Sequence, residues 1–276
     1  MNRKELKKAT EELRRDLINL IYHAGTGHTG GDLSVLNVLS VLYNYQLKNI
    51  SSDDDKNPDR DRFVLSKGHC AEALYTVLHS KGYISDEDMA AYGKFHAHLG
   101  GHPDNSIKGV EVNTGALGHG LGIGVGMALA AKMNRQSYKT YVMMGDGEQA
   151  EGSIYEAAMA ANKYHLDNLV AFIDRNRLQI SGSTEDVMPL ESIAERWTAF
   201  AWDVKTIDGD DIDSIIDALD AIDFTGGKPH LFISKTTKGL GVSFMENVAK
   251  WHHGVPNEEQ YRQALADIDQ RIEALS

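Results

Sequence analysis

Apolar residues recur at two different spacings along the chain, and the two spacings alternate. Short, mostly apolar runs typical of buried strands cover residues 63–65, 140–144, 169–173 and 230–234, and the more polar residues 203–207 are also expected to form a strand. Segments with helical character cover residues 2–22, 34–47, 71–80, 118–133, 149–164, 191–200, 210–222 and the tail from residue 257. This alternation predicts an α/β fold, a doubly wound, mostly parallel sheet with helices on both faces.

Polar and small residues mark the boundaries between these elements. Asp32 and Ser34 can cap the helix expected over residues 34–47, and Ser85 can begin a further short helix. Residues 96–114 lack periodicity and are rich in His, Gly and Asp. A long loop of this kind inside a compact fold is usually functional. Since we find no internal repeat or linker, we expect one domain over residues 1–276.

Charge and composition narrow the range of functions. The formal net charge of −12 argues against a nucleic-acid partner, which favours a basic stripe. No apolar run approaches the ~20 residues of a membrane-spanning helix. The charged first residues lack the apolar core of a signal peptide, so we expect a cytoplasmic protein. Cys70 is the only cysteine, which excludes internal disulfides and argues against a cysteine-based zinc site.

The most informative motif is a Gly-Asp-Gly tripeptide, residues 145–147, which follows a buried strand. Asn176 lies about 30 residues later, after the next strand, so both loops are expected at the same edge of a parallel sheet. If the tripeptide stood alone, we would interpret it as an ordinary turn. Asp146, the Asn176 amide and the Leu178 carbonyl offer hard oxygen ligands, which suit Mg²⁺ or Ca²⁺. The helix expected from about Gln149 would direct free N–H groups toward a bound anion.

Glycines occupy every second position from residue 118 to residue 126. This spacing does not match G-x-G-x-x-G, so it does not predict an NAD-binding fold. We interpret the small residues as a surface for close helix packing, beside the cofactor or a partner chain. Cys70 has no base and orienting group in the sequence pattern, so we interpret it as a spectator thiol rather than a nucleophile.

Several segments together resemble the transketolase family, and the matches run in family order from about residue 10 to residue 260. The Gly-Asp-Gly segment resembles the thiamine-diphosphate motif. The other matching segments are Gly-His loops and glycine-rich stretches at residues 27–31, 65–69, 101–103, 114–122, 235–239 and 251–254. Thr29, Ala116 and His119 depart from residues that are more usual in full-length transketolases, which leaves the sugar preference open.

The resemblance implies a thiamine diphosphate site with Mg²⁺, for which Ca²⁺ or Mn²⁺ can substitute. It assigns the metal to Asp146, Asn176 and Leu178. It assigns the cofactor to His69, Gly115, Ala116, Leu117, Asp146, Gly147, Glu151, Asn176, Lys238 and His253. The resemblance assigns catalytic roles to His28, His69, His102 and His253. Histidine side chains can donate and accept protons near neutral pH. His252 is adjacent to His253, and we favour His253 because it precedes Gly254. A zinc site at His96, His98 and His102 is a minor alternative.

The resemblance covers only the first domain of a transketolase, which transfers a two-carbon ketol unit from a ketose to an aldose. The family also needs a pyrimidine-binding domain, with a glutamate that activates the cofactor, and a third domain. We therefore expect a carboxy-terminal partner subunit that carries the pyrimidine domain, in an α2β2 heterotetramer. The expected substrates are sugar phosphates of the pentose phosphate pathway, with no nucleic acid or membrane partner.

Three alternatives stay open at this point. One is another thiamine-diphosphate enzyme, a relative of 1-deoxy-xylulose-5-phosphate synthase or of the alpha chain of a 2-oxo acid dehydrogenase. A second is a transketolase specialised for an unusual sugar, sulfonated or branched. The third is a cofactor-binding relative without catalytic activity. The series of Gly-His loops argues against the dehydrogenase.

Overall fold

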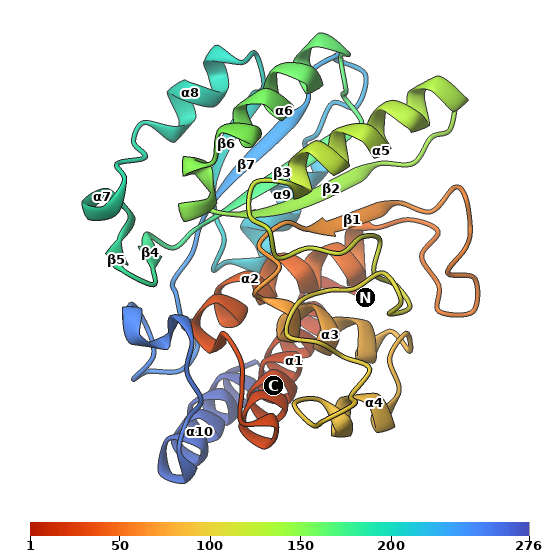
Figure 1. The fold of residues 1–276 in the computed structure, drawn as a ribbon. Helices are drawn as coiled ribbons and strands as arrows, with labels where there is room; N and C mark the ends of the chain where they lie inside the picture. The colour runs from red at the N-terminus through yellow and green to blue at the C-terminus, as the bar shows by residue number, and fades with distance from the viewer. Residues whose placement is uncertain (276) are drawn as a thin grey trace.

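The computed structural model describes residues 1–275, which are built around a five-stranded parallel sheet (Figure 1). The spatial order is β1-β2-β3-β7-β6, and every neighbouring pair is parallel. All five predicted strands are confirmed, within two residues at each end. They are β1 (Arg62–Leu65), β2 (Thr140–Gly145), β3 (Leu169–Arg175), β6 (Asp203–Asp208) and β7 (His230–Lys235).

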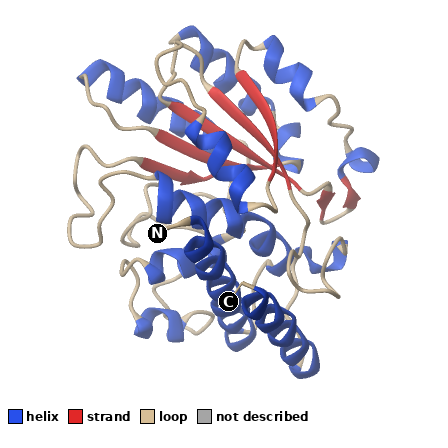
Figure 2. Ribbon diagram, turned by 180° about the vertical axis from the view of Figure 1, so that it is seen from behind, coloured by secondary structure: helices blue, strands red, loops and turns tan. Residues whose placement is uncertain are grey.

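Both faces of the sheet are buried along β1, β2, β3 and β7, as the predicted fold requires, whereas the edge strand β6 is half-exposed. In β2, Tyr141 and Met143 enter one apolar cluster, whereas Val142 and Met144 enter the other. Figures 1 and 2 show helices over both sides of the strands. One cluster includes α5 (Gly120–Asn134), α6 (Gly152–Lys163) and α8 (Ile193–Ala199); the other includes α1 (Arg3–Ala24), α2 (Thr29–Val41), α3 (Ala71–Ser80) and α9 (Ile212–Asp220).

The second helix begins earlier than predicted. α2 begins at Thr29 and continues into a π-helical turn at Leu42–Gln46. Asp32 and Ser34 therefore lie inside the helix rather than at its cap. Both are fully buried: Asp32 accepts a hydrogen bond from the Ala73 N–H, and Ser34 donates to the Asp174 carboxylate. Their tertiary contacts, which local sequence does not reveal, explain the error.

The segment after the Gly-Asp-Gly motif also differs from the prediction. A short 3-10 turn, Gly147–Ala150, precedes α6, which begins only at Gly152. Beyond β3, the chain forms an unpredicted hairpin of β4 (Leu178–Gln179) and β5 (Gly182–Ser183), followed by α7 (Thr184–Val187). These pieces are too short for a periodic pattern to show.

The remaining predicted elements are confirmed. Ser85 caps α4 (Asp86–Ala91) by accepting from the Asp88 N–H. Between residues 92 and 119 the described chain contains no helix or strand, as expected for the long loop. Among residues 1–275, none of the helices is both long and apolar enough to cross a membrane.

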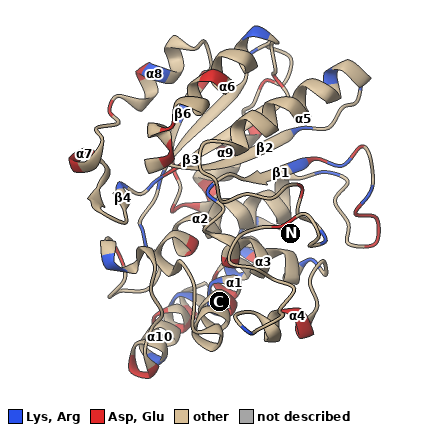
Figure 3. Ribbon diagram, in the orientation of Figure 1, with Lys and Arg blue, Asp and Glu red and all other residues tan. Residues whose placement is uncertain are grey.

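The first and last helices pack against each other across the outside of the fold. Asn257 caps α10 (Glu258–Ala274), whose Arg271 pairs with Glu11 of α1 at 2.9 Å. Glu11 also pairs with the fully buried Arg14, at 3.0 Å. Figure 3 shows acidic and basic residues interspersed along α1 and α10. Ion pairs and apolar packing therefore join segments about 250 residues apart.

The alternating glycines of α5 divide into two groups. A Cβ at Gly124 would overlap Val142 of β2, whereas a Cβ at Gly126 would meet nothing within 4 Å. A Cβ at Gly120 would likewise overlap Ser66, and Gly122 faces open space. The predicted close packing is therefore confirmed for Gly120 and Gly124, whereas Gly122 and Gly126 face away from the rest of this chain.

This division predicts opposite effects of two matched substitutions. Gly126→Ala should raise the free energy of unfolding by up to about 1 kcal/mol, because alanine favours a helix. Gly124→Ala should lower it by about 1 to 3 kcal/mol, because the methyl group overpacks the β2 interface. Urea unfolding followed by circular dichroism measures both. Equal effects of the two changes would contradict the assignment.

Candidate functional site

The carboxyl ends of β1, β2 and β3 meet at one edge of the sheet, where they border a pocket of about 380 Å³. Nine of the predicted site residues line this pocket: His28, His69, Gly115, Leu117, Asp146, Gly147, Asn176, Leu178 and Lys238. Four others do not line it: His102, Ala116, Glu151 and His253. The structure thus gathers residues from six loops that are widely separated in the sequence.

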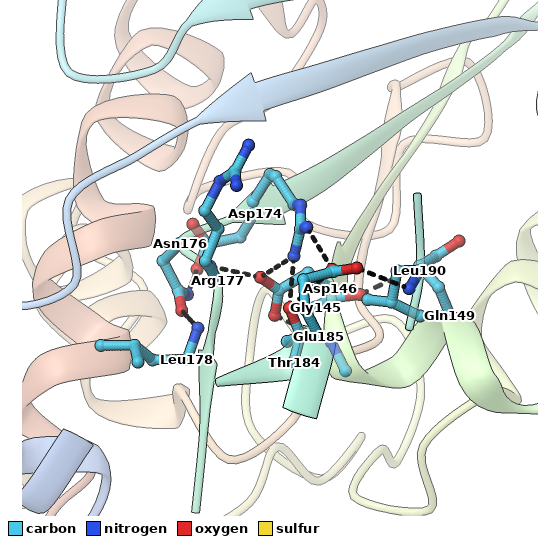
Figure 4. Close-up of polar contacts among 12 residues, drawn as sticks. Gly145, Asp146, Gln149, Asp174, Asn176, Arg177, Leu178, Thr184, Glu185 and Leu190 are labelled. Carbon is cyan, nitrogen blue, oxygen red and sulfur yellow. Dashed lines mark hydrogen bonds and ion pairs between the residues drawn. The ribbon is translucent and has the colours of Figure 1, made fainter. Parts of the chain in front are cut away.

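Asp146 is almost fully buried and is held by donors from two loops (Figure 4). Its carboxylate accepts from the Gly147 N–H at 2.8 Å and from the Arg177 N–H at 2.6 Å. The Arg175 guanidinium lies 3.3 Å from Oδ2. Burial and the neighbouring Asp174 charge nevertheless raise the pKa of Asp146. A bound cation would offset the energetic cost of keeping this buried carboxylate ionised.

The other two predicted metal ligands lie next to Asp146 in the same pocket. The Asn176 side-chain oxygen accepts from the Leu178 N–H at 3.0 Å, and the Leu178 carbonyl accepts from Lys238 Nζ at 3.1 Å. One carboxylate, one amide oxygen and one carbonyl, with room left in the pocket, form a donor set suited to a hard cation. The residues present therefore fit the divalent ion that the sequence suggested.

The zinc alternative finds no support. Among residues 1–275, no three His, Cys, Asp or Glu side chains are gathered so that they could hold a metal ion. His98 instead lies 3.7 Å from Asp88. The structure therefore does not bring His96, His98 and His102 together as the alternative requires.

A buried ion pair between Lys67 and Asp174 fixes the strand ends, and no sequence pattern predicts it. Lys67 follows β1, and Asp174 lies in β3 at the carboxyl edge of the sheet. Burial favours the neutral forms, but the mutual attraction is stronger: it raises the pKa of Lys67 and lowers that of Asp174. Asp174 also accepts from Ser34, Asn176 and Thr236. This carboxylate therefore connects α2, β1, β3 and the segment after β7.

Glu148, which also lines the pocket, has a similar role. Its carboxylate accepts from the Ser66 hydroxyl, from the Gly118 N–H at 2.8 Å and from the Gly145 N–H at 2.8 Å. Burial raises the pKa of Glu148. The motif contained this residue, but nothing in the sequence indicated its three partners. It holds the loops before α5 and after β1 and β2 together.

Five imidazoles gather at the mouth and inner wall of the pocket. The His28 ring lies 5.3 Å from His69, 4.7 Å from His253 and 6.4 Å from His102, measured between ring centroids. The His252 ring is stacked at 5.3 Å on His69. The predicted histidine cluster therefore exists as a set of close neighbours.

The inner histidines are neutral at physiological pH. Burial, with smaller effects from His253 and His102, lowers the pKa of His28 to about 4. Burial and the Lys238 charge lower the pKa of His252 to about 3, and burial and Lys67 lower that of His69. A neutral imidazole has one donor nitrogen and one acceptor nitrogen. Such rings can both position hydroxyl groups and accept protons from them.

The two adjacent histidines occupy different places. His252 lines the pocket, and its Nδ1 lies 3.1 Å from Lys238 Nζ. His253 is exposed and approaches His28 at the outside of the cluster. Burial and Lys67 lower the pKa of Lys238. The side chain nearest the predicted cofactor residues is thus His252, which the sequence had left as the second choice.

Cys70 is fully buried, and burial raises the pKa of its thiol. A buried thiol of this kind is a poor nucleophile. This environment agrees with the interpretation of Cys70 as a spectator.

The chain matches one protein family over most of its length. Residues 5–267 match the family described as transketolase, thiamine diphosphate binding domain. An apulose-4-phosphate transketolase subunit from Phocaeicola vulgatus is 58% identical, over 98% of this chain and 96% of the relative. A 6-deoxy-6-sulfo-D-fructose transketolase subunit from Clostridium sp. is 39% identical, over 96% of each chain.

Solved structures give the same result for the fold. The transketolase of Campylobacter jejuni superimposes with a TM-score of 0.92 at 34% identity. The match covers 98% of this chain but only 43% of that one. The chain thus spans less than half of this full-length transketolase, and nearly all of the two relatives named as subunits.

Loss of the Asp174 carboxylate should strongly destabilise the fold. Asp174→Asn leaves Lys67 charged and buried without its partner, so the free energy of unfolding should fall by about 3 to 5 kcal/mol. Glu258→Gln removes one member of an exposed pair with Arg262 and should cost less than about 1 kcal/mol. Chemical unfolding of the two variants side by side measures the difference, and a similar small loss in both would contradict the role of Asp174.

Proposed function

This chain belongs to the transketolase family, and from that premise we propose that it is the amino-terminal subunit of a two-chain transketolase. The enzyme is a transferase that moves a two-carbon ketol unit from a ketose phosphate to an aldose phosphate. One observation carries the proposal: Asp146, Asn176, the Leu178 carbonyl, Lys238 and the inner histidines border a single pocket. Metal ligands, a cation for a phosphate group and neutral imidazoles are the groups that this reaction needs.

Asp146, Asn176 and the Leu178 carbonyl would hold Mg²⁺, and Ca²⁺ or Mn²⁺ could replace it. Arg175 and Lys238 now contact two of these ligands, at 3.3 and 3.1 Å. A metal bound to the Leu178 carbonyl would replace Lys238 there, and Lys238 would then be free to pair with a diphosphate oxygen. When bound, thiamine diphosphate supplies the nucleophilic carbon that accepts the ketol unit. Gly147 offers its backbone to the diphosphate, and Gly115 and Leu117 border the same space.

The histidines would hold the sugar and move its protons. His28, His69 and His252 are neutral near pH 7, because burial lowers their pKa values. Cleavage of the ketose removes a proton from a hydroxyl group, and a neutral imidazole can accept it. His102 lies near His28 on the long loop and would contact the sugar from the outer side.

The donor sugar is a branched or otherwise specialised ketose phosphate in this proposal. The relative at 58% identity is named for apulose 4-phosphate, whereas the transketolase of known structure is 34% identical. The 58% identity extends over 98% of this chain, and it favours apulose 4-phosphate as the substrate. The ordinary substrates of the pentose phosphate pathway are the second candidate.

A partner subunit would complete the site in an α2β2 heterotetramer. The chain covers less than half of a full-length transketolase, and relatives of its own length are named as subunits. Leu117 and Ile180, which line the pocket, expose apolar surface. A partner chain with the pyrimidine domain would cover this surface and supply the activating glutamate. Because charged sugar phosphates do not cross membranes unaided, the cytoplasm is the expected compartment.

The test is ketol transfer by the chain with its partner subunit, thiamine diphosphate and Mg²⁺. Apulose 4-phosphate and xylulose 5-phosphate serve as donors in parallel. Activity should require both chains, and the branched donor should give the higher kcat/KM. Activity of the single chain would contradict the two-chain proposal, and turnover of pyruvate would favour a different thiamine-diphosphate enzyme.

Asp146→Ala should weaken Mg²⁺-dependent cofactor binding to the two-chain complex by about 10- to 100-fold or more, because it removes the only carboxylate of the predicted ligand set. Asp186→Ala, on the exposed side of the nearby α7, is the matched control and should bind normally. Titration calorimetry measures both. Normal binding by Asp146→Ala would show that the metal lies elsewhere.

A further inference from the structure

Arg175 carries a buried guanidinium that contacts the proposed metal ligand Asp146, although Arg175 itself does not line the pocket. Its Nη1 donates to Asp146 Oδ2 at 3.3 Å and to Thr184 Oγ1 at 2.6 Å. Its Nη2 donates to Glu185 Oε1 at 2.7 Å and to Glu191 Oε1 at 2.9 Å. Figure 4 shows Thr184 and Glu185 beside Asp146. One side chain therefore joins the end of β2 to the segment that follows β5.

The contacts of Asp146 distinguish its two oxygens. Oδ2 accepts from Arg175 Nη1 and from the Arg177 N–H at 2.6 Å. Within the described chain, Oδ1 accepts from the Gly147 N–H alone, at 2.8 Å. A carboxylate oxygen has about two lone pairs for such contacts. Both lone pairs of Oδ2 thus have donors, and one lone pair of Oδ1 remains for a metal ion. Arg175 therefore fixes the rotation of the carboxylate, which decides the oxygen that is offered.

The same guanidinium supports the turn that carries the other two proposed ligands. Arg177, which lies between them, has a φ of 66°, a left-handed conformation that is uncommon outside glycine. Its N–H donates to Asp146, and its carbonyl accepts from the Thr184 N–H at 3.0 Å. Such a backbone persists where the surrounding contacts fix it. Because Arg175 also holds Thr184, it helps to fix this turn and, with it, the direction of the Leu178 carbonyl.

Two partly exposed carboxylates hold Arg175 from the solvent side. The side chain of Glu185 is 33% exposed and that of Glu191 is 50% exposed. Glu185 also accepts from the Leu190 N–H at 3.2 Å, so its own position is fixed. A guanidinium is planar and presents its N–H groups as a rigid fork, whereas a lysine ammonium acts as a compact point charge. This place in the structure therefore needs the shape of arginine and not only its charge.

We propose that Arg175 is a positioning residue for the divalent ion. It orients Asp146 so that Oδ1 faces the ion, and through residues 184–191 it keeps the Leu178 carbonyl directed into the pocket. It touches neither the ion nor the cofactor, and it acts through these ligands. The inference rests on the proposed function for the presence of the metal, and it adds a residue that sets the metal affinity. Outer contacts of this kind change metal affinity by about 10- to 100-fold.

A Mn²⁺ titration of the two-chain complex with thiamine diphosphate tests the proposal, with the unbound ion measured by electron paramagnetic resonance. Arg175→Lys keeps the charge, so that repulsion of the ion is unchanged, but its ammonium cannot serve all the acceptors of the guanidinium. The dissociation constant of this variant for Mn²⁺ should rise about 10- to 100-fold. Asp186→Asn, an exposed change on α7 next to Glu185, is the matched control and should bind as the wild type does.

A second variant breaks the same contacts from the other side. Glu185→Gln with Glu191→Gln leaves Arg175 in place but removes its two charged acceptors on the segment, so it should also weaken Mn²⁺ binding. Combined with Arg175→Lys, it should cause little further loss, because both variants remove the same contacts. A general effect of lost negative charge would instead add to that of Arg175→Lys. Amide exchange of residues 178–183, followed by mass spectrometry, should be faster in each variant than in the wild type.

Wild-type Mn²⁺ affinity in Arg175→Lys, with only a lower stability in urea, would indicate a purely structural role and overturn the proposal. Additive losses in the combined variant would also overturn it, because residues 184–191 would then act independently of Arg175. If Arg175→Lys does not fold, Glu191→Gln alone decides, because this half-exposed side chain is not needed to fill the core. Unchanged Mn²⁺ affinity in Glu191→Gln would contradict the proposal.

Failure of the proposed metal site would give a different pattern. If Asp146→Ala loses Mn²⁺ binding while Arg175→Lys keeps it, only the role of Arg175 is refuted. If Asp146→Ala binds Mn²⁺ normally, the metal lies elsewhere and both proposals fail. Because binding is measured without turnover, the identity of the sugar substrate does not affect either result.

Discussion

The ion pair between Lys67 and Asp174 is the interaction on which the arrangement of the site depends. A parallel sheet brings its strand ends together, but it does not fix the loops that follow them. Asp174, at the carboxyl edge of the sheet, accepts hydrogen bonds from the segments after β1, β3 and β7 and from α2. Each of these segments contains or directly follows a pocket residue: His69, Asn176, Lys238 and, before α2, His28. Burying two charges is costly, and it is sustained here because every oxygen of the carboxylate is paired.

Local patterns predicted the fold well where an element is long and regular. Four strands, β1, β2, β3 and β7, are mostly apolar and buried by helices on both faces of the sheet, so sequence and tertiary structure agree there. The edge strand β6 is more polar and half-exposed. The prediction failed at α2, where Asp32 and Ser34 resemble cap residues but are buried by partners on α3 and β3. It also failed for the hairpin and α7, which contain two to four residues each.

The site was predictable to the extent that its chemistry follows from residue type and from position after a strand. Asp146, Asn176 and the Gly-His pair at residues 68–69 have both properties, whereas His28 follows a helix and His102 lies in the long loop. Lys67, Glu148 and Arg175 do not, because their roles come from partners that are distant in the sequence. The choice between His252 and His253 depends on a single 3-10 turn, Ala249–His252, which ends at His252, so that His252 lines the pocket and His253 follows in extended conformation and is exposed. No spacing rule could have separated them.

The packing of α10 on α1 has a consequence for how the protein is made. Residues of α1 such as Glu11 find their partner Arg271 only after about 260 further residues have left the ribosome. At typical synthesis rates this takes on the order of tens of seconds. During that time the side of α1 that will face α10 has no final neighbour, although α2 and α3 can already pack on its other side. The growing polypeptide therefore exposes part of its amino-terminal helix until α10 emerges.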